Sequence, residues 1–358
     1  MTQQTPYAAA DGLVRVYPAD AAAARRTPAL VWAHGGGFVA GDLDMPEADW
    51  VARAFAARGV TVVSVDYRLV GADGANVYPA GSDDLLAAWS WTRVHADDLG
   101  IDPVRIVVGG ASAGANLTAG AVLRTLCLTP GRRGPGTSGS AGGADRSPDA
   151  AVEAAPGSDA PSAGFTPAGV FLAYPTLLAV QPAPDAALRA MLDANPVADR
   201  FGPARVLEMY ETYLGGAVDG APLPAVPGLA TPADLDGFPP VLMVNGEADE
   251  LRVSGEAFAV TLAAAGVPVE IVTEPGTEHG HLNRPDEPAA SVTVERVMRW
   301  VDDLGGRVAA QPRPETTHAG LGTGASRPTR PPALDTGAPG PTRPPTPTTV
   351  STTEGITS

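Results

Sequence analysis

One serine stands inside a Gly-x-Ser-x-Gly pentad that runs from Gly110 to Gly114, with Ser112 at its centre. The two glycines leave room for a sharp turn, and a serine hydroxyl on such a turn can attack a carbonyl carbon. Because the chain has 42 glycines, chance alone would produce this pentad with a probability of about 0.2. The pentad therefore leaves a second interpretation open, a serine that only caps or packs a helix.

A serine nucleophile needs a base, an acid that orients the base, and N–H donors for the oxyanion. Three further segments offer these groups, namely "HGGGF" (34–38), "NGEADELR" (245–252) and "GTEHGHL" (276–282). The glycines of the first segment expose backbone N–H groups without obstruction by Cβ atoms. The candidate acids are Glu247, Asp249 and Glu250, and the candidate bases are His279 and His281.

The elements between these segments predict where they meet. Near-continuous apolar runs predict strands at 12–18, 28–34, 60–67, 104–110, 169–175, 240–246 and 267–275. Helical periodicity between the strands predicts helices at 44–58, 83–96, 113–128, 204–214, 254–265 and around 294–304. This alternation predicts an α/β fold with a mostly parallel sheet covered by helices on both faces. Active sites of such sheets lie at the carboxyl ends of strands, and all four candidate segments follow a strand.

Composition divides the chain into an α/β domain and two segments with few large apolar residues. Residues 130–166 consist largely of Gly, Pro, Ala, Ser and Asp, and residues 306–358 are rich in Pro and Thr. Neither segment can bury enough surface to offset its ordering entropy, so we expect a disordered insert and a disordered tail. The catalytic domain is expected at 11–305, with 176–225 as a partial cap over the site.

The charge and residue usage of the chain exclude several function classes. The formal net charge of −16 disfavours nucleic acid and anionic membranes as partners. All 24 basic residues are arginine, which excludes lysine-dependent phosphate, Schiff-base and Ser-x-x-Lys chemistry. The chain has no run of 18 apolar residues, so no membrane span is predicted. The N-terminus also lacks the features of a signal peptide. With Cys127 as its one cysteine, the chain is expected in the cytoplasm.

Several motifs resemble those of the hormone-sensitive-lipase-like serine esterases of the α/β-hydrolase fold, the bacterial family IV. The resemblance covers roughly residues 11–305 without the insert. It implies an α/β-hydrolase fold and a carboxylesterase activity. The matching segments are "HGGGFVAGDLDM" (34–45), "VVSVDYRL" (62–69), "YPAGSDDL" (78–85), "GASAGANL" (110–117), "LDGFPPVLMVNGEADELRVSGEAFAVTLAAAGVPVE" (235–270) and "GTEHGHL" (276–282).

Carried over residue by residue, the resemblance implies a Ser-His-Asp catalytic triad. Ser112 is the nucleophile, His279 is the general base in preference to His281, and Asp249 is the acid in preference to Glu247 and Glu250. The resemblance also implies an oxyanion hole formed by the N–H groups of Gly36, Gly37 and Ala113. His34 and Gly35 would support the oxyanion loop, and no metal or cofactor is implied.

Three departures from the family pattern concern the surroundings of the site. Ala111 stands where relatives usually carry an acidic residue, so we expect one hydrogen bond near the oxyanion loop to be missing. His281 stands where a phenylalanine is usual. Only about ten residues precede the strand at 12–18, where relatives carry a helical cap, so the resemblance implies a reduced cap.

These observations predict an enzyme that hydrolyses short-chain carboxylic esters, with a small-molecule ester as its partner. Two alternatives remain at this point, a serine peptidase or amidase on the same fold and a non-catalytic hydrolase-fold ligand-binding protein. The oligomeric state is left open, a homodimer being one option.

Overall fold

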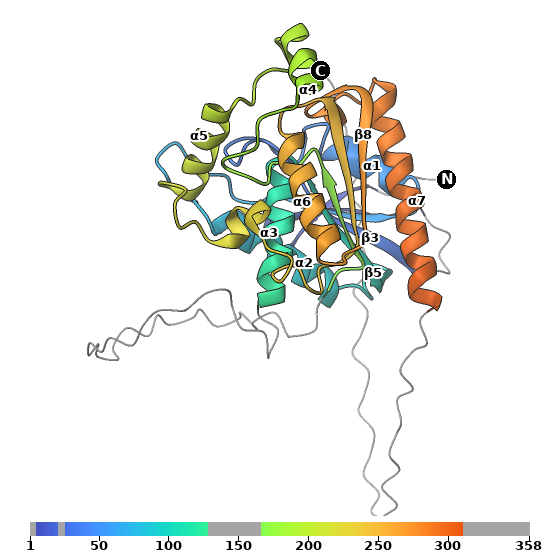
Figure 1. The fold of residues 1–358 in the computed structure, drawn as a ribbon. Coiled ribbons are helices and arrows are strands. Elements are labelled where there is room, and N and C mark those ends of the chain that lie inside the picture. The colour runs from blue at the N-terminus through green and yellow to red at the C-terminus, as the bar shows by residue number, and fades with distance from the viewer. Residues whose placement is uncertain (1–4, 21–25, 128–165, 311–358) are drawn as a thin grey trace, which may run out of the picture. The chain divides into compact units, whose positions relative to one another are not determined.

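The computed structural model describes residues 5–20, 26–127 and 166–310 (Figure 1). Apart from their ends, the insert predicted at 130–166 and the tail predicted at 306–358 lie outside these residues, so both stay predictions. The described residues all belong to one unit, Met1–Pro312.

The centre of the fold is an eight-stranded sheet with the order β1-β2-β4-β3-β5-β6-β7-β8. Strand β2 is antiparallel to both of its neighbours, and the other pairs are parallel. This architecture confirms the predicted mostly parallel α/β sheet. The strands are β1 (Tyr7–Ala9), β2 (Val14–Tyr17), β3 (Thr27–Ala33), β4 (Thr61–Val65), β5 (Ile101–Ala111), β6 (Gly169–Ala173), β7 (Val241–Ala248) and β8 (Val269–Glu278).

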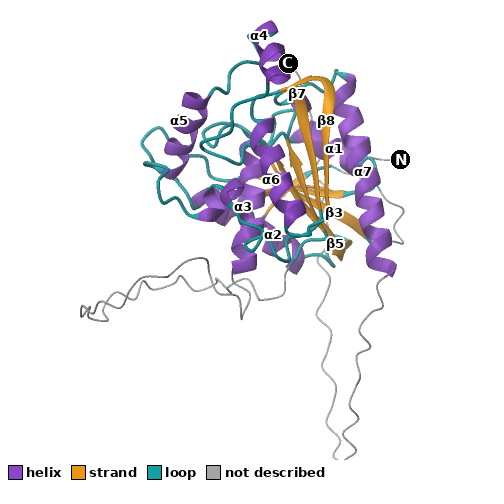
Figure 2. Cartoon of the chain, viewed as in Figure 1, coloured by secondary structure: helices purple, strands orange, loops and turns teal. Residues whose placement is uncertain are grey.

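Helices cover both faces of the sheet, with α1 and α7 on one side and α2, α3 and α6 on the other (Figures 1 and 2). Each helix among the described residues is too short or too polar to span a lipid bilayer. The helices are α1 (Asp49–Ala56), α2 (Ala80–Val94), α3 (Ala113–Cys127), α4 (Ala186–Ala194), α5 (Pro203–Leu214), α6 (Arg252–Ala264) and α7 (Pro288–Ala310). Short 3-10 turns are η1 (Ala10–Gly12), η2 (Leu223–Ala225), η3 (Pro227–Leu229) and η4 (His281–Asn283).

The central strands are apolar throughout because both of their faces are buried. In β3, Leu30 and Trp32 join the core under α1 and α7, whereas Val31 and Ala33 join the core under α2 and α3. Successive strand residues point to opposite faces, so each face receives alternate side chains. A strand that is buried on both sides thus appears in the sequence as an unbroken apolar run.

The structure differs from the predicted elements at several places, among them strand β1, which was not expected. Helix α4 was not expected, because only Leu188 and Leu192 of its residues are buried and its apolar pattern is short. Helix α1 begins at Asp49 rather than near Asp44, since Pro46 and its neighbours form turns. The last helix continues to Ala310, beyond the domain boundary predicted at 305.

Candidate active site

Four predicted site residues each follow directly after the last residue of a parallel strand. His34 comes after β3, Ser112 after β5, Asp249 after β7 and His279 after β8. Because the carboxyl ends of parallel strands lie at the same edge of a sheet, this placement gathers the four residues from distant parts of the sequence.

Ser112 lies in a sharp turn between β5 and α3. Its φ is +51°, a left-handed conformation that is costly for a residue other than glycine. A Cβ on Gly110 would lie 2.3 Å from the Gly114 carbonyl oxygen, and a Cβ on Gly114 would lie 2.2 Å from that of Ala33. Both glycines are therefore required by close backbone packing, as the pentad predicts, and the serine is held at the start of the helix.

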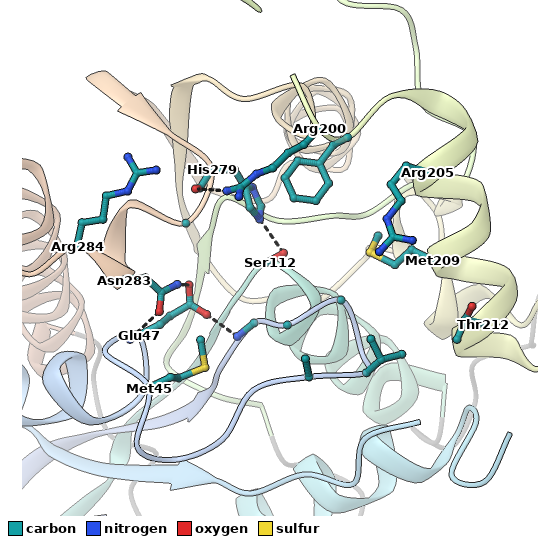
Figure 3. Close-up of a pocket in the computed structure, with 17 residues that line it drawn as sticks. Met45, Glu47, Ser112, Arg200, Arg205, Met209, Thr212, His279, Asn283 and Arg284 are labelled. Atoms are coloured by element: carbon teal, nitrogen blue, oxygen red, sulfur yellow. Dashed lines mark hydrogen bonds between the residues drawn. The ribbon is translucent and has the colours of Figure 1, made fainter. Parts of the chain in front are cut away.

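A continuous chain of hydrogen bonds joins Ser112 to His279 and Asp249. His279 Nε2 lies 2.9 Å from Ser112 Oγ, and His279 Nδ1 lies 2.8 Å from Asp249 Oδ2 (Figure 3). Since an ionised carboxylate only accepts hydrogen bonds, Nδ1 donates to Asp249 and Nε2 accepts from the serine hydroxyl. Asp249 is fully buried, and its other oxygen accepts from the Leu251 N–H at 3.0 Å, which fixes the carboxylate.

The two other candidate acids make different contacts. Glu247 accepts from the Gly276 N–H at 2.8 Å, away from the imidazole. Glu250 is buried, its Oε2 has no hydrogen-bond partner among the described residues, and burial raises the pKa of its carboxyl. Of the three acids that the sequence offers, Asp249 alone contacts His279 in this part of the chain.

Backbone donors face the same cavity as Ser112. The N–H groups of Gly36, Gly37 and Ala113 have no acceptor among the described residues. Gly36 and Gly37 have φ values of +126° and +61°, and a Cβ on Gly36 would lie 1.8 Å from the Ala40 carbonyl oxygen. Only glycine fits this loop at position 36, so the loop can present its N–H groups toward an anion at the serine.

Glu47 was not predicted as a site residue, but its side chain is buried beneath the oxyanion loop. One carboxyl oxygen accepts from the Gly35 N–H at 2.5 Å. The other accepts from the Tyr174 hydroxyl and, at 3.0 Å, from Asn283 Nδ2. An acid from the loop before α1 thus binds the backbone of the oxyanion loop through Gly35. In the sequence, Glu47 stands within the segment 44–58 that was predicted as a helix, and its residue type alone does not mark it as buried.

His34 and Tyr67 hold the start of the same loop. His34 Nδ1 lies 2.7 Å from the Gly35 carbonyl oxygen, and the Tyr67 hydroxyl donates to the His34 carbonyl at 2.8 Å. The two rings stack with their centroids 4.5 Å apart. His34 is buried beside the loop and lies outside the Ser112 hydrogen-bond chain, in keeping with the supporting role that the resemblance implies.

A cavity of about 740 Å³ opens above Ser112. Its roof comes from the predicted cap segment 176–225, through Arg200, Phe201 and the α5 side chains Arg205, Met209 and Thr212. Within 176–225, the apolar residues expected to cover the site are Leu177, Leu178, Met191, Leu192 and Phe201. Of these, only Phe201 is in the cavity lining, where it packs edge-on against His279 at 4.5 Å between ring centroids. Leu177, Leu178 and Leu192 are buried in the core instead.

Helix α5 is docked firmly onto the parts of the site that lie below it. Asn116 on α3 donates to the Tyr210 hydroxyl at 2.9 Å. Phe38 of the oxyanion loop stacks on Tyr213 with ring centroids 3.9 Å apart. The roof is therefore attached both to the helix that carries the serine turn and to the loop that carries the donors.

His281 lies two residues from His279 but belongs to the core. Its Nε2 hydrogen-bonds Thr293 Oγ1 at 2.9 Å, while Nδ1 has no partner among the described residues. Burial, together with the neighbouring His279, lowers the pKa of His281 to about 4. Within the described ranges there is also no group of three or more His, Cys, Asp or Glu side chains arranged to hold a metal ion.

Comparison with known proteins gives one family and many relatives. The family model described as alpha/beta hydrolase fold matches residues 30–283. Carboxylesterase NlhH of Mycobacterium tuberculosis is 35% identical over 258 residues, which are 72% of this chain and 67% of that protein. Ethyl acetate hydrolase of Pseudomonas putida is 30% identical over 262 residues, which are 71% of this chain and 66% of that protein. The chain thus spans about two thirds of the length of these relatives.

Solved structures with the same fold also match this chain. The esterase of Pyrobaculum calidifontis matches with a TM-score of 0.63 and 26% identity, covering 84% of each chain.

The buried His281 predicts a stability that depends on acidity. The unfolded chain takes up a proton on this imidazole near its ordinary pKa of 6.5, whereas the folded protein resists protonation down to about 4. The free energy of unfolding therefore falls as the pH drops from about 6.5 to about 4, by on the order of 3 kcal/mol from this group. In His281→Phe this part of the loss should disappear, as measured by urea unfolding at pH 7 and near pH 4.

His95→Phe provides a control, because His95 lies partly exposed at the end of α2 and should keep the wild-type difference between the two pH values. An equal loss of stability in wild type and His281→Phe would contradict the prediction.

Proposed function

This chain belongs to the α/β-hydrolase-fold family, among its hormone-sensitive-lipase-like carboxylic ester hydrolases, and we propose that Ser112, His279 and Asp249 carry out its ester hydrolysis. The observation that carries the proposal is the hydrogen-bond chain from Asp249 to Ser112 at a cavity that Gly36 and Gly37 also line, whose N–H groups have no acceptor among the described residues.

In the first half of the reaction, Ser112 is acylated. Its Oγ attacks the ester carbonyl carbon while His279 Nε2 takes the hydroxyl proton. Asp249 keeps the imidazole oriented and stabilises the imidazolium that forms. The negative charge that develops on the carbonyl oxygen is received by the N–H groups of Gly36, Gly37 and Ala113. When the tetrahedral intermediate collapses, the alcohol oxygen leaves and takes its proton from His279.

In the second half, water releases the acyl group. His279 removes a proton from a water molecule as the water oxygen attacks the acyl carbon of the serine ester. The same N–H groups stabilise the second oxyanion. Collapse of this intermediate returns the proton to Ser112 Oγ and frees a carboxylic acid, so the site is restored without any cofactor.

Two alternative functions differ in whether they need the catalytic triad. A serine peptidase or amidase would need the same triad, and a ligand-binding protein without activity would not need it. The names of the similar proteins, a carboxylesterase and an ethyl acetate hydrolase, support ester substrates. Side-by-side assays of p-nitrophenyl acetate and an aminoacyl nitroanilide separate the three possibilities.

We further propose short acyl groups as the preferred substrates. The cavity must hold the acyl and alcohol halves together, and its roof on α5 is fixed by packing rather than free to open. Val39, on the cavity wall, is 46% exposed, so that this wall borders on water. An acyl chain that extends past such a wall buries no further methylene groups.

The triad predicts the effect of two substitutions. Ser112→Ala should abolish ester hydrolysis apart from a residual acceleration of about 10³–10⁴-fold over water, which the oxyanion hole and binding supply. Asp249→Asn should lower kcat by about 10⁴-fold because the imidazole loses its orientation. Both are measured with p-nitrophenyl acetate on variants whose folding is checked by circular dichroism.

Glu250→Gln is the matched control and should retain wild-type turnover. Near-normal hydrolysis by folded Ser112→Ala would overturn the proposed function.

Glu47 predicts a loss of turnover without direct contact with the reacting atoms. In Glu47→Gln one oxygen becomes an NH₂ group, which cannot accept a hydrogen bond. Either the Gly35 N–H or the pair formed by the Tyr174 hydroxyl and Asn283 Nδ2 therefore loses its acceptor. The oxyanion loop should shift, and kcat should fall by about 10–10²-fold with a small change in KM. Glu247→Gln changes an acid of β7 that accepts from the Gly276 N–H rather than from the oxyanion loop, and it should leave both constants unchanged. Equal kcat values in folded Glu47→Gln and wild type would show that Glu47 does not position the loop.

The open wall predicts a limit to acyl length. Each methylene buried on the way from acetyl to about hexanoyl should raise kcat/KM by up to about fourfold, or about 0.8 kcal/mol. Longer chains should add nothing because their extra carbons stay in water. A series of p-nitrophenyl esters from acetyl to dodecanoyl measures this, and a kcat/KM still rising at dodecanoyl would contradict the short-chain preference.

A further inference from the structure

Three arginines line the cavity of a strongly acidic chain. They are Arg200, Arg205 and Arg284, whereas the formal net charge of the chain is −16. The single carboxyl in the lining is Glu47, and both of its oxygens are already engaged by the protein's own donors. Positive charge is therefore concentrated at the one place where the substrate enters.

Two of these arginines are paired with carboxylates. Arg205 donates to Glu208 at 2.8 Å, and both side chains are exposed. Arg284 donates to Glu278 at 2.7 Å and lies 3.8 Å from Glu287. These pairs reduce the charge that a ligand would meet at either side chain.

Arg200 differs because it forms no ion pair among the described residues. Its guanidinium donates to the His279 carbonyl oxygen at 3.1 Å, and its Cζ lies 5.3 Å from the centroid of the Phe201 ring. A guanidinium has five N–H donors, so this arrangement orients the group and leaves donors free. A planar cation of this kind binds a carboxylate through two parallel hydrogen bonds.

The position of Arg200 indicates which half of the ester substrate lies beside it. In Figure 3, Arg200 and His279 lie on one side of Ser112, and Glu47, which holds the oxyanion loop, lies on the other. The leaving alcohol must receive its proton from His279 Nε2, so the alcohol half of the substrate lies on the His279 side. Arg200 is bonded to the backbone of that same histidine.

We propose that Arg200 binds a carboxylate on the alcohol half of the substrate, so that the enzyme prefers acyl esters of hydroxycarboxylic acids over neutral esters of the same shape. This inference rests on the proposed esterase function and adds the substrate class. Arg205 and Arg284 contribute to the positive field, and Arg200 makes the direct contact.

A matched pair of substrates tests the proposal. 4-Acetoxybenzoate carries a carboxylate on its alcohol half, and 4-acetoxybenzamide is a neutral compound of nearly the same shape. The measured quantity is the ratio of kcat/KM for the benzoate to that for the benzamide, which cancels effects of a variant on the triad itself. In Arg200→Gln this ratio should fall about tenfold, the order expected when one charge-assisted hydrogen bond is lost. Raising the salt from about 0.05 M to about 0.5 M should lower the wild-type ratio.

Two further variants serve as controls. Arg200→Lys keeps the charge but loses the planar pair of donors, so its ratio should lie between those of wild type and Arg200→Gln. Arg58→Gln removes the same charge from an exposed end of α1, outside the cavity lining, and should leave the ratio unchanged.

The outcomes separate this inference from the proposed function. A ratio in Arg200→Gln equal to that of wild type would overturn the inference, while hydrolysis of p-nitrophenyl acetate that depends on Ser112 would still support the esterase. If Arg200 instead affected only esters charged on the acyl half, such as phenyl hemisuccinate compared with phenyl acetate, the assignment to the alcohol half would be wrong. Absence of hydrolysis of every ester would reject the proposed function itself.

Discussion

The backbone contact between α3 and β3 is the constraint on which the site depends. Gly114 packs against the carbonyls of Ala33 and His34, and this contact keeps Ser112 in its left-handed turn, a conformation that costs about 1–3 kcal/mol. The same contact fixes the end of β3, from which the oxyanion loop begins. One interface therefore positions both the proposed nucleophile and the proposed N–H donors, and any residue larger than glycine at 114 would separate them.

The roof extends this rigid unit rather than acting as a separate lid. Tyr210 of α5 contacts Asn116, and Tyr213 contacts Phe38, so α5 rests on the serine helix and on the oxyanion loop at once. Substrate enters a site whose shape is already formed. The energy of binding is then available for orientation and charge recognition instead of closing a loop.

Much of this arrangement was predictable from the sequence, and the remainder was not for identifiable reasons. Strands buried on both faces appear as apolar runs, and the Gly-x-Ser-x-Gly and His-Gly-Gly-Gly motifs mark their ends, so the edge of the sheet that carries the site follows directly. Glu47 was missed because its partners come from distant segments, and burial of an acid leaves no local pattern. Arg200 was missed because its environment depends on how the segment before α5 folds over His279.

His279 follows β8, which in the described part of the sheet pairs only with β7, whereas Ser112 follows the central strand β5. Strands at the margin of a sheet open locally at a lower free energy than strands at its centre. The proposed general base is thus attached to an edge strand, and the proposed nucleophile to a central strand. Heat or denaturant should separate the imidazole from the serine while most of the sheet remains intact, so that inactivation precedes global unfolding.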